Sequence, residues 1–300
     1  MSAAVQCVGL GRRYGKVWAL RDCSMSIPRG SVAALVGPNG AGKTTLLEIA
    51  VGLLDPTEGE LRILSESVRG QTTALLAQIG FVAQDAPLYR SFSVADMLRF
   101  GRHTNRTWDD ALARERLRRL DIPLDRPCGQ LSGGQQAQVA LTVAVAKRPQ
   151  LLLLDEPVAR LDPLARREFL ESLMEIVSEG DVTVLLSSHM ISDLERVCDH
   201  LVLLQDGHVA LAGATDALIA GHRLLSGPRR DLEDIEHAFT VIDSRSTERQ
   251  MTLLVRGNGA VHDPRVEVTA VNLEDLVLAY LRRRRPIVAD SHRELSGVGS

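Results

Sequence analysis

The sequence has few of the features that mark a secreted or membrane-embedded protein. Its four cysteines (Cys7, Cys23, Cys128 and Cys198) form no C-x-x-C pair and have no metal-binding spacing, which favours reduced thiols over disulfides or a metal cluster. It contains no stretch of about 20 predominantly apolar residues, as a transmembrane helix needs. The N-terminus also lacks the basic-then-apolar order of a signal peptide. We therefore expect a cytoplasmic protein with no membrane span.

Lysine and aromatic residues are also scarce. Of 35 basic residues only Lys16, Lys43 and Lys147 are lysines, and aromatic residues make up 3% of the chain. A lysine at a chemically meaningful spacing therefore carries unusual weight. The formal net charge of −3 gives no indication of a nucleic-acid partner. The length of 300 residues and the hydrophobic fraction of 45% predict a globular chain of two domains, or one domain with an appendage.

Apolar runs alternate with helical patterns over the first two thirds of the chain. This order predicts an α/β fold with a largely parallel sheet and helices on both of its faces. Residues 86–147 contain helical patterns only, including a basic amphipathic segment at 109–120. We interpret them as a helical subdomain inserted into the α/β core. The predicted strands span residues 30–37, 79–82, 151–154, 182–186 and 201–204.

The pattern changes from about residue 224. A helix over 232–238, a hairpin formed by 239–244 and 250–256, and a helix over 273–282 capped by Asn272 predict a small α+β unit. We therefore expect a main domain over residues 1–222, a C-terminal accessory domain over 223–285, and a loose tail over 286–300.

A phosphate-binding loop follows the first predicted core strand. The segment beginning at Gly37 matches G-x-x-x-x-G-K-[ST], between an apolar strand and a helix. Glycines let backbone N–H groups approach phosphate oxygens, and the N-terminus of the following helix adds positive potential. Lys43 would reach the β- and γ-phosphates, and the Thr44 hydroxyl would bind Mg²⁺. The predicted ATP-binding residues here are Gly37, Pro38, Asn39, Gly40, Ala41, Gly42, Lys43, Thr44 and Thr45.

Two adjacent carboxylates end the apolar strand at 151–154. Asp155 would hold Mg²⁺, and Glu156 would accept a proton from the attacking water. Taken alone, the pattern is equally compatible with an ordinary strand end. Together with the phosphate loop it predicts a nucleotide-hydrolysing site.

A second glycine-rich helix start, Leu131-Ser132-Gly133-Gly134-Gln135, offers backbone and hydroxyl donors for phosphate. With the phosphate loop, Asp155-Glu156 and an isolated His189 after an apolar strand, it resembles the nucleotide-binding subunit of ATP-binding cassette (ABC) transporters over about residues 5–213. The resemblance implies a P-loop NTPase core of ABC type. It also implies ATP and Mg²⁺ as ligands and a dimer in which Ser132, Gly133, Gly134 and Gln135 contact the ATP of the other subunit.

The resemblance also implies roles for four isolated residues. Tyr14 matches the aromatic residue that stacks on adenine, and Gln84 matches the glutamine that contacts Mg²⁺ or the lytic water. Asp162 matches the loop that crosses the dimer interface, and His189 matches the histidine that contacts the γ-phosphate. The sequence departs from the family after the signature segment, where the helix contains no basic residue before Lys147. The resemblance therefore does not explain how that helix is anchored.

These motifs predict a Mg²⁺-dependent ATPase subunit that energises a separate transmembrane permease and pairs with a second ATP-binding subunit, as a homodimer or heterodimer. We expect it on the cytoplasmic face of the cell membrane, with no nucleic-acid partner. The segment 272–277 resembles the tail of subunits that export drugs, antibiotics or lipids. Two alternatives remain open: an importer subunit, and a non-transport ABC ATPase that acts on nucleic acid or ribosomes.

Overall fold

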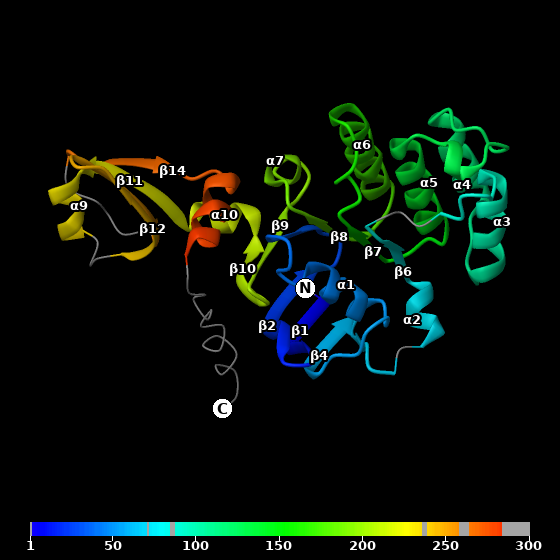
Figure 1. The fold of residues 1–300 in the computed structure, drawn as a ribbon, viewed down its shortest axis with the longest axis horizontal. Coiled ribbons are helices and arrows are strands. Elements are labelled where there is room, and N and C mark those ends of the chain that lie inside the picture. The colour runs from blue at the N-terminus through cyan, green and yellow to red at the C-terminus, as the bar shows by residue number, and fades with distance from the viewer. Residues whose placement is uncertain (1, 71, 85–87, 236–238, 258–263, 284–300) are drawn as a thin grey trace.

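The computed structural model describes residues 2–70, 72–84, 88–235, 239–257 and 264–283, and the predicted tail at 286–300 lies outside them. Figure 1 shows the C-terminal sheet at one end of the molecule and the helices α3, α4 and α5 at the other. Between these ends lies a six-stranded sheet in the order β10-β9-β3-β8-β7-β6. Its strands are β3 (Val32–Val36), β6 (Ile79–Val82), β7 (Leu151–Asp155), β8 (Thr183–Ser188), β9 (His200–Gln205) and β10 (His208–Ala214).

The central sheet is parallel from β6 to β9, with β10 added antiparallel at one edge. The largely parallel sheet predicted from the apolar runs is therefore confirmed. Strands β3, β7 and β8 are buried at every position, as continuous apolar strands are when both faces of a sheet are covered. Their carboxyl ends lie along the same edge of the sheet, which is where open α/β folds bind ligands.

Different elements cover the two faces of this sheet. Leu35 and Leu153 pack against α1 (Lys43–Ala50) and the N-terminal sheet. Val36 and Leu154 face the opposite way, toward α5 (Gly133–Ala146) and α6 (Pro163–Glu179). Helices on both faces are thus confirmed.

The N-terminal antiparallel sheet was not predicted from the sequence. Its order is β2-β1-β4-β5, and it shares one hydrophobic core with α1 and the central sheet. Its two long strands, β1 and β2, alternate buried and exposed residues and are interrupted by polar side chains, so they contain no long apolar run. The elements of this region are β1 (Ala3–Tyr14), β2 (Val17–Pro28), β4 (Glu58–Ile63), β5 (Glu66–Ser67) and the short helix α2 (Thr73–Ala77).

The described part of residues 86–147 contains helices and no strand, and we refer to these helices as the helical subdomain. The predicted helix over 109–120 is confirmed as α4 (Asp110–Arg119), and Asp109 caps it by accepting a hydrogen bond from the Leu112 N–H. The subdomain has its own apolar core, centred on Leu98 and Leu117. Its other elements are α3 (Val94–Thr104), the 3-10 helix η1 (Cys128–Gln130) and α5.

A third sheet, in the order β12-β13-β11-β14, forms the C-terminal unit. The predicted hairpin is confirmed as the antiparallel pair β12-β13. The predicted capped helix is also confirmed, because the Asn272 side chain accepts a hydrogen bond of 2.7 Å from the Asp275 N–H. The helix expected over 232–238 begins earlier, at Arg229, and residues 236–238 lie outside the described part. The remaining elements are α7 (Ile191–Leu194), α8 (Thr215–Ala220), β11 (His222–Pro228), α9 (Arg229–Ile235), β12 (Thr240–Ser246), β13 (Gln250–Arg256), β14 (Glu267–Ala270) and α10 (Leu273–Arg282).

Candidate nucleotide-binding site

The predicted phosphate loop connects β3 to α1 at the carboxyl edge of the central sheet. Gly42 adopts a left-handed conformation (φ +105°), and a Cβ on it would lie 2.5 Å from the Ala19 carbonyl oxygen. Gly37 is similarly constrained, because a Cβ there would overlap the carbonyl oxygen of Leu204. The loop can therefore take this tight path only with glycine at both positions.

The start of α1 offers donors suited to phosphate. Gly42 is the N-cap residue, and no side chain of the described residues caps the helix there. The first backbone N–H groups of a helix have no intrahelical acceptor, and they lie at the positive end of the helix dipole. Asn39, Gly40 and Thr44 at this turn are exposed. The loop thus fits an anionic phosphate chain.

Lys43, Glu156 and His189 meet at the end of this loop. Lys43 is buried, and its Nζ donates to the carbonyl oxygens of Gly37 at 2.8 Å and Pro38 at 3.3 Å. The same Nζ lies 3.2 Å from Glu156 Oε1. The other carboxylate oxygen of Glu156 lies 3.1 Å from His189 Nδ1. The structure therefore brings together three residues that the sequence placed in separate motifs.

Sequence reasoning missed Ser187, which joins the two adjacent carboxylates. Its Oγ donates to Asp155 Oδ1 at 2.7 Å and accepts from the Glu156 N–H at 2.8 Å. Ser187 lies beside Asp155 in the parallel pairing of β7 and β8, and it is fully buried. Its position as a serine near the end of an otherwise apolar strand was the available signal.

The oxygen donors near Asp155 fit Mg²⁺ bound together with a nucleotide. Among the described residues, no three His, Cys, Asp or Glu side chains gather as a metal cluster. Mg²⁺ is usually held by one or two protein oxygens together with substrate phosphates and water. The Asp155 carboxylate and the Thr44 hydroxyl could supply those protein oxygens. Gln84 follows β6, whose last residues pair with β7 beside Asp155, and its side chain is exposed at the same edge.

Tyr14 ends β1, and its ring is 46% exposed. The Arg12 guanidinium carbon lies 5.0 Å from the centroid of the ring, and Arg12 in turn donates to the Asp55 carbonyl oxygen at 2.7 Å. The guanidinium thus supports one side of an exposed aromatic ring, an arrangement suited to stacking. The following strand, β2, contacts the phosphate loop, because Ala19 and Leu20 lie against Gly42.

The signature segment lies at the start of α5, beside α6. Ser132 Oγ accepts from the Gln135 N–H at 3.2 Å, and Gln135 Oε1 accepts from the Ser132 N–H at 3.1 Å. Gly134 allows close packing, since a Cβ on it would lie 2.9 Å from Ala165 Cβ. Asp162 caps α6 through two backbone N–H groups at 3.0 Å each.

The signature segment is not joined to the Lys43 group. Within the described part of the chain, no hydrogen bond or ion pair connects Ser132, Gly133, Gly134 or Gln135 to Lys43, Glu156 or His189. Most of the predicted site residues therefore fall into two groups, and no hydrogen bond or ion pair of the described residues joins one group to the other. One comprises the phosphate loop and the carboxylates, and the other comprises the signature segment and Asp162.

The parallel sheet, the glycine loop ahead of α1 and the paired carboxylates at the sheet edge define a P-loop NTPase. Residues 20–159 match the model of a protein family described as "ABC transporter". The chain is 31% identical over 295 residues to the Nod factor export ATP-binding protein I of Sinorhizobium fredii, covering 92% of this chain and 85% of that protein. It therefore belongs to the ABC transporter family and is one of its ATP-hydrolysing, ATP-binding subunits.

Two further similarities refine this relationship. The sulfate/thiosulfate import ATP-binding protein of Vibrio vulnificus is 34% identical over 224 residues, covering 72% of this chain and 65% of that protein. A dimeric structure of a bacterial ABC transporter cassette has a TM-score of 0.62 at 26% identity, covering 70% of this chain and 98% of that chain. None of the described helices is long and apolar enough to cross a membrane.

Proposed function

We propose that the chain binds ATP with Mg²⁺ and hydrolyses it to drive a separate transmembrane permease. The observation that carries the proposal is the buried cluster of Lys43, Asp155, Glu156 and Ser187 at the end of the phosphate loop. Backbone N–H groups of residues 39–45 bind the phosphates, Lys43 pairs with the β- and γ-phosphates, and adenine stacks on Tyr14. Thr44, Asp155 and Gln84 hold Mg²⁺, which supplies positive charge against the transferring phosphoryl group.

Glu156 is the proposed general base. Its carboxylate lies between Lys43 and His189, so a phosphate that draws Lys43 away leaves the carboxylate available to accept a proton from water. His189 then contacts the γ-phosphate from the opposite side. Asp155 remains oriented by the Ser187 hydroxyl, which holds it beside the metal position.

The second group of residues acts across a dimer in this proposal. Because Ser132–Gln135 make no hydrogen bond to the phosphate loop of their own chain among the described residues, they are suited to the ATP of a second subunit, with Asp162 at the interface. The dimeric structure of a similar cassette supports this arrangement. The second subunit can be a copy of this chain or a different cassette.

An aromatic surface formed by Tyr89, Phe92 and Phe100 is the proposed docking site for the permease. The Tyr89 ring centroid lies 5.0 Å from that of Phe92 and 5.5 Å from that of Phe100, and Tyr89 is 55% exposed. Exposed aromatic clusters are typical of protein interfaces. Docking there places the chain on the cytoplasmic face of the membrane. A Phe92→Asp variant should lose the permease and transport while retaining ATP binding, and unchanged complex formation would refute this surface.

Export of a drug, antibiotic or lipid-like compound is the proposed direction. The match to the Nod factor export protein extends over 92% of this chain and so reaches beyond the cassette. The match to the sulfate importer covers 72%. We propose that residues 223–285 form the accessory domain shared with such exporters. Import is the second candidate, since importer subunits are also similar.

Transport by inside-out membrane vesicles containing the chain and its permease tests both activity and direction. ATP and Mg²⁺ added to the bath should drive cargo into the vesicles if the complex exports. ATP-driven loss of cargo from loaded vesicles would instead show import. ATP hydrolysis that is independent of any membrane partner and stimulated by nucleic acid or ribosomes would contradict the transport proposal.

A further inference from the structure

The helix that follows the signature segment is anchored to α6 without a charged residue of its own. Gln138, on α5, is buried, and its Nε2 donates to Ser172 Oγ at 3.2 Å and to the Glu168 carbonyl oxygen at 3.4 Å. Both acceptors belong to α6. The start of the same helix packs tightly on α6 where Gly134 meets Ala165. The position of the signature segment therefore depends on how α5 rests on α6.

A cation from a third helix completes this contact. Arg116, on α4, donates from Nη2 to Gln138 Oε1 at 3.2 Å and from Nη1 to the Ser172 carbonyl oxygen at 3.4 Å. Burial lowers the pKa of its guanidinium, while the nearby charges of Glu175 and Glu179 raise it. A half-buried guanidinium with two directed bonds fixes geometry more strictly than a flexible ammonium.

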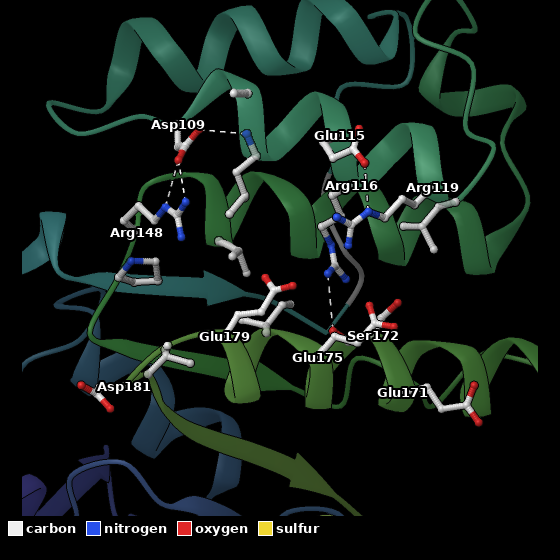
Figure 2. Close-up of a pocket in the computed structure, with 18 of the residues that line it drawn as sticks. Asp109, Glu115, Arg116, Arg119, Arg148, Glu171, Ser172, Glu175, Glu179 and Asp181 are labelled. Atoms are coloured by element: carbon white, nitrogen blue, oxygen red, sulfur yellow. Dashed lines mark hydrogen bonds and ion pairs between the residues drawn. The ribbon is translucent and has the colours of Figure 1, made fainter.

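The contact of Arg116 with Gln138 and Ser172 lies at the wall of a cavity. A cavity of about 990 Å³ lies between α4 and α6, and Figure 2 shows Arg116 extending from α4 toward Ser172 on α6. Arg119 on the same helix instead pairs with Glu115 at 3.0 Å, without leaving α4. Arg116 thus connects the helical subdomain with the core across a gap that the packing does not fill.

We propose that Arg116 is a positioning residue that holds the helical subdomain against α6 and thereby sets how Ser132 faces the ATP of the second subunit. This inference rests on the proposed dimeric mechanism. Gln138 lies about one and a half helical turns after the start of α5, and α6 begins at Pro163, directly after its cap residue Asp162. A small rotation of α4 and α5 about α6 would therefore move the signature segment relative to the Asp162 loop.

The test separates dimer closure from nucleotide binding. In the Glu156→Gln background, Arg116→Met should leave binding of a fluorescent ATP analogue by the monomer within about twofold of the parent. ATP-driven dimerisation, followed by light scattering, should need about tenfold more ATP, as expected when bonds to a charged group are lost. Arg116→Lys should show an intermediate loss, because an ammonium cannot make both directed bonds.

Two further variants show whether the loss of dimerisation in Arg116→Met comes from the missing contact with α6. Arg119→Met is the matched control, since Arg119 is 61% exposed and bonds only within α4 in the described contacts, and it should dimerise like the parent. Adding Gln138→Arg to Arg116→Met returns a cation to the contact from α5 and should restore most of the dimerisation.

Three results would contradict the inference. They are unchanged dimerisation of Arg116→Met, a parallel loss of nucleotide binding and dimerisation, and failure of Gln138→Arg to restore the dimer. Absence of any ATP-driven dimer in the Glu156→Gln parent would instead refute the proposed dimeric mechanism itself. The two failures are thus distinguishable in one series of measurements.

Discussion

The ammonium of Lys43 lies 3.2 Å from the Oε1 atom of Glu156, and both side chains are almost fully buried. The lysine belongs to the phosphate loop, whereas the glutamate follows β7. A phosphate that attracts Lys43 must therefore compete with the proposed general base for the same cation. This arrangement would couple arrival of the nucleotide to release of the Glu156 carboxylate.

The first prediction concerns the stability of this ion pair. Lys43→Met should lower the free energy of unfolding by about 3 kcal/mol, because it leaves a buried carboxylate without its cation. Lys43→Met combined with Glu156→Gln should recover most of that loss. Urea denaturation of the wild type, both single variants and the double variant at pH 7.5 measures the coupling. Purely additive effects would show that the two side chains do not stabilise each other.

The second prediction concerns chemistry. Glu156→Gln keeps the shape of the side chain but removes the proton acceptor, so ATP hydrolysis should slow by about 100-fold or more. The variant should still bind ATP and accumulate as a nucleotide-bound dimer, visible by light scattering. Glu171→Gln is a suitable control, because Glu171 is an exposed partner of Arg167 on α6. A Glu156→Gln protein that remains monomeric in saturating ATP and Mg²⁺ would contradict the sandwich arrangement.

The third prediction tests the bridging hydroxyl of Ser187. Ser187→Ala leaves the Glu156 N–H without its acceptor and frees the orientation of Asp155. We expect hydrolysis to slow by about tenfold and the Mg²⁺ concentration for half-maximal activity to rise. ATP binding measured without Mg²⁺ should stay unchanged.

Thr183→Val is the matched control for Ser187→Ala. Thr183 is also buried on β8, but its hydroxyl accepts a hydrogen bond from the Gly30 N–H, at the far end of the strand. Both variants should lower stability, and only Ser187→Ala should change the Mg²⁺ requirement. An unaltered Mg²⁺ dependence in Ser187→Ala would show that the hydroxyl does not act through Asp155.

The parts of the site that the sequence revealed are those whose signal is local. The phosphate loop needs glycine at positions such as Gly42, where the backbone is left-handed and close to another strand. The apolar run of β7 and the carboxylate Asp155 are likewise contiguous, so strand and ligand are predicted together. Asn272 could be recognised as a helix cap for the same reason.

The parts that the sequence did not reveal depend on pairing between distant segments. Ser187 acquires its role from the register of β7 and β8, which places it beside Asp155. In the sequence Gln138 is an ordinary polar residue, and its role depends on the hydrogen bond that it accepts from Arg116 of α4. Strands β1 and β2 alternate buried and exposed residues and contain polar side chains, so their sheet is specified by packing on α1 rather than by composition.

The last prediction concerns how the stability of the protein depends on pH through His222, which links α8 to α10. His222, on β11, is buried, with Nδ1 2.7 Å from the Leu218 carbonyl oxygen and Nε2 2.9 Å from the Tyr280 hydroxyl. A carbonyl only accepts, so Nδ1 carries a proton, and in the neutral ring Nε2 then accepts from the Tyr280 hydroxyl. Burial has the largest effect on the pKa of His222 and lowers it, which favours the neutral imidazole. The hydrogen bond to Leu218 opposes this effect, and Arg256 adds to it.

Because the pKa is lower in the folded chain, the unfolded chain binds more protons between the two pKa values. Stability should therefore be constant above the ordinary histidine pKa of about 6.5, and it should fall as the pH drops below it. His222→Gln removes this titration, so its loss of stability between pH 7.5 and pH 5.5 should be smaller than that of the wild type. His200, whose pKa burial also lowers, remains in both proteins and contributes to the residual pH dependence. Urea denaturation at the two pH values checks this. Equal pH dependence in the two proteins would show that His222 does not titrate on unfolding.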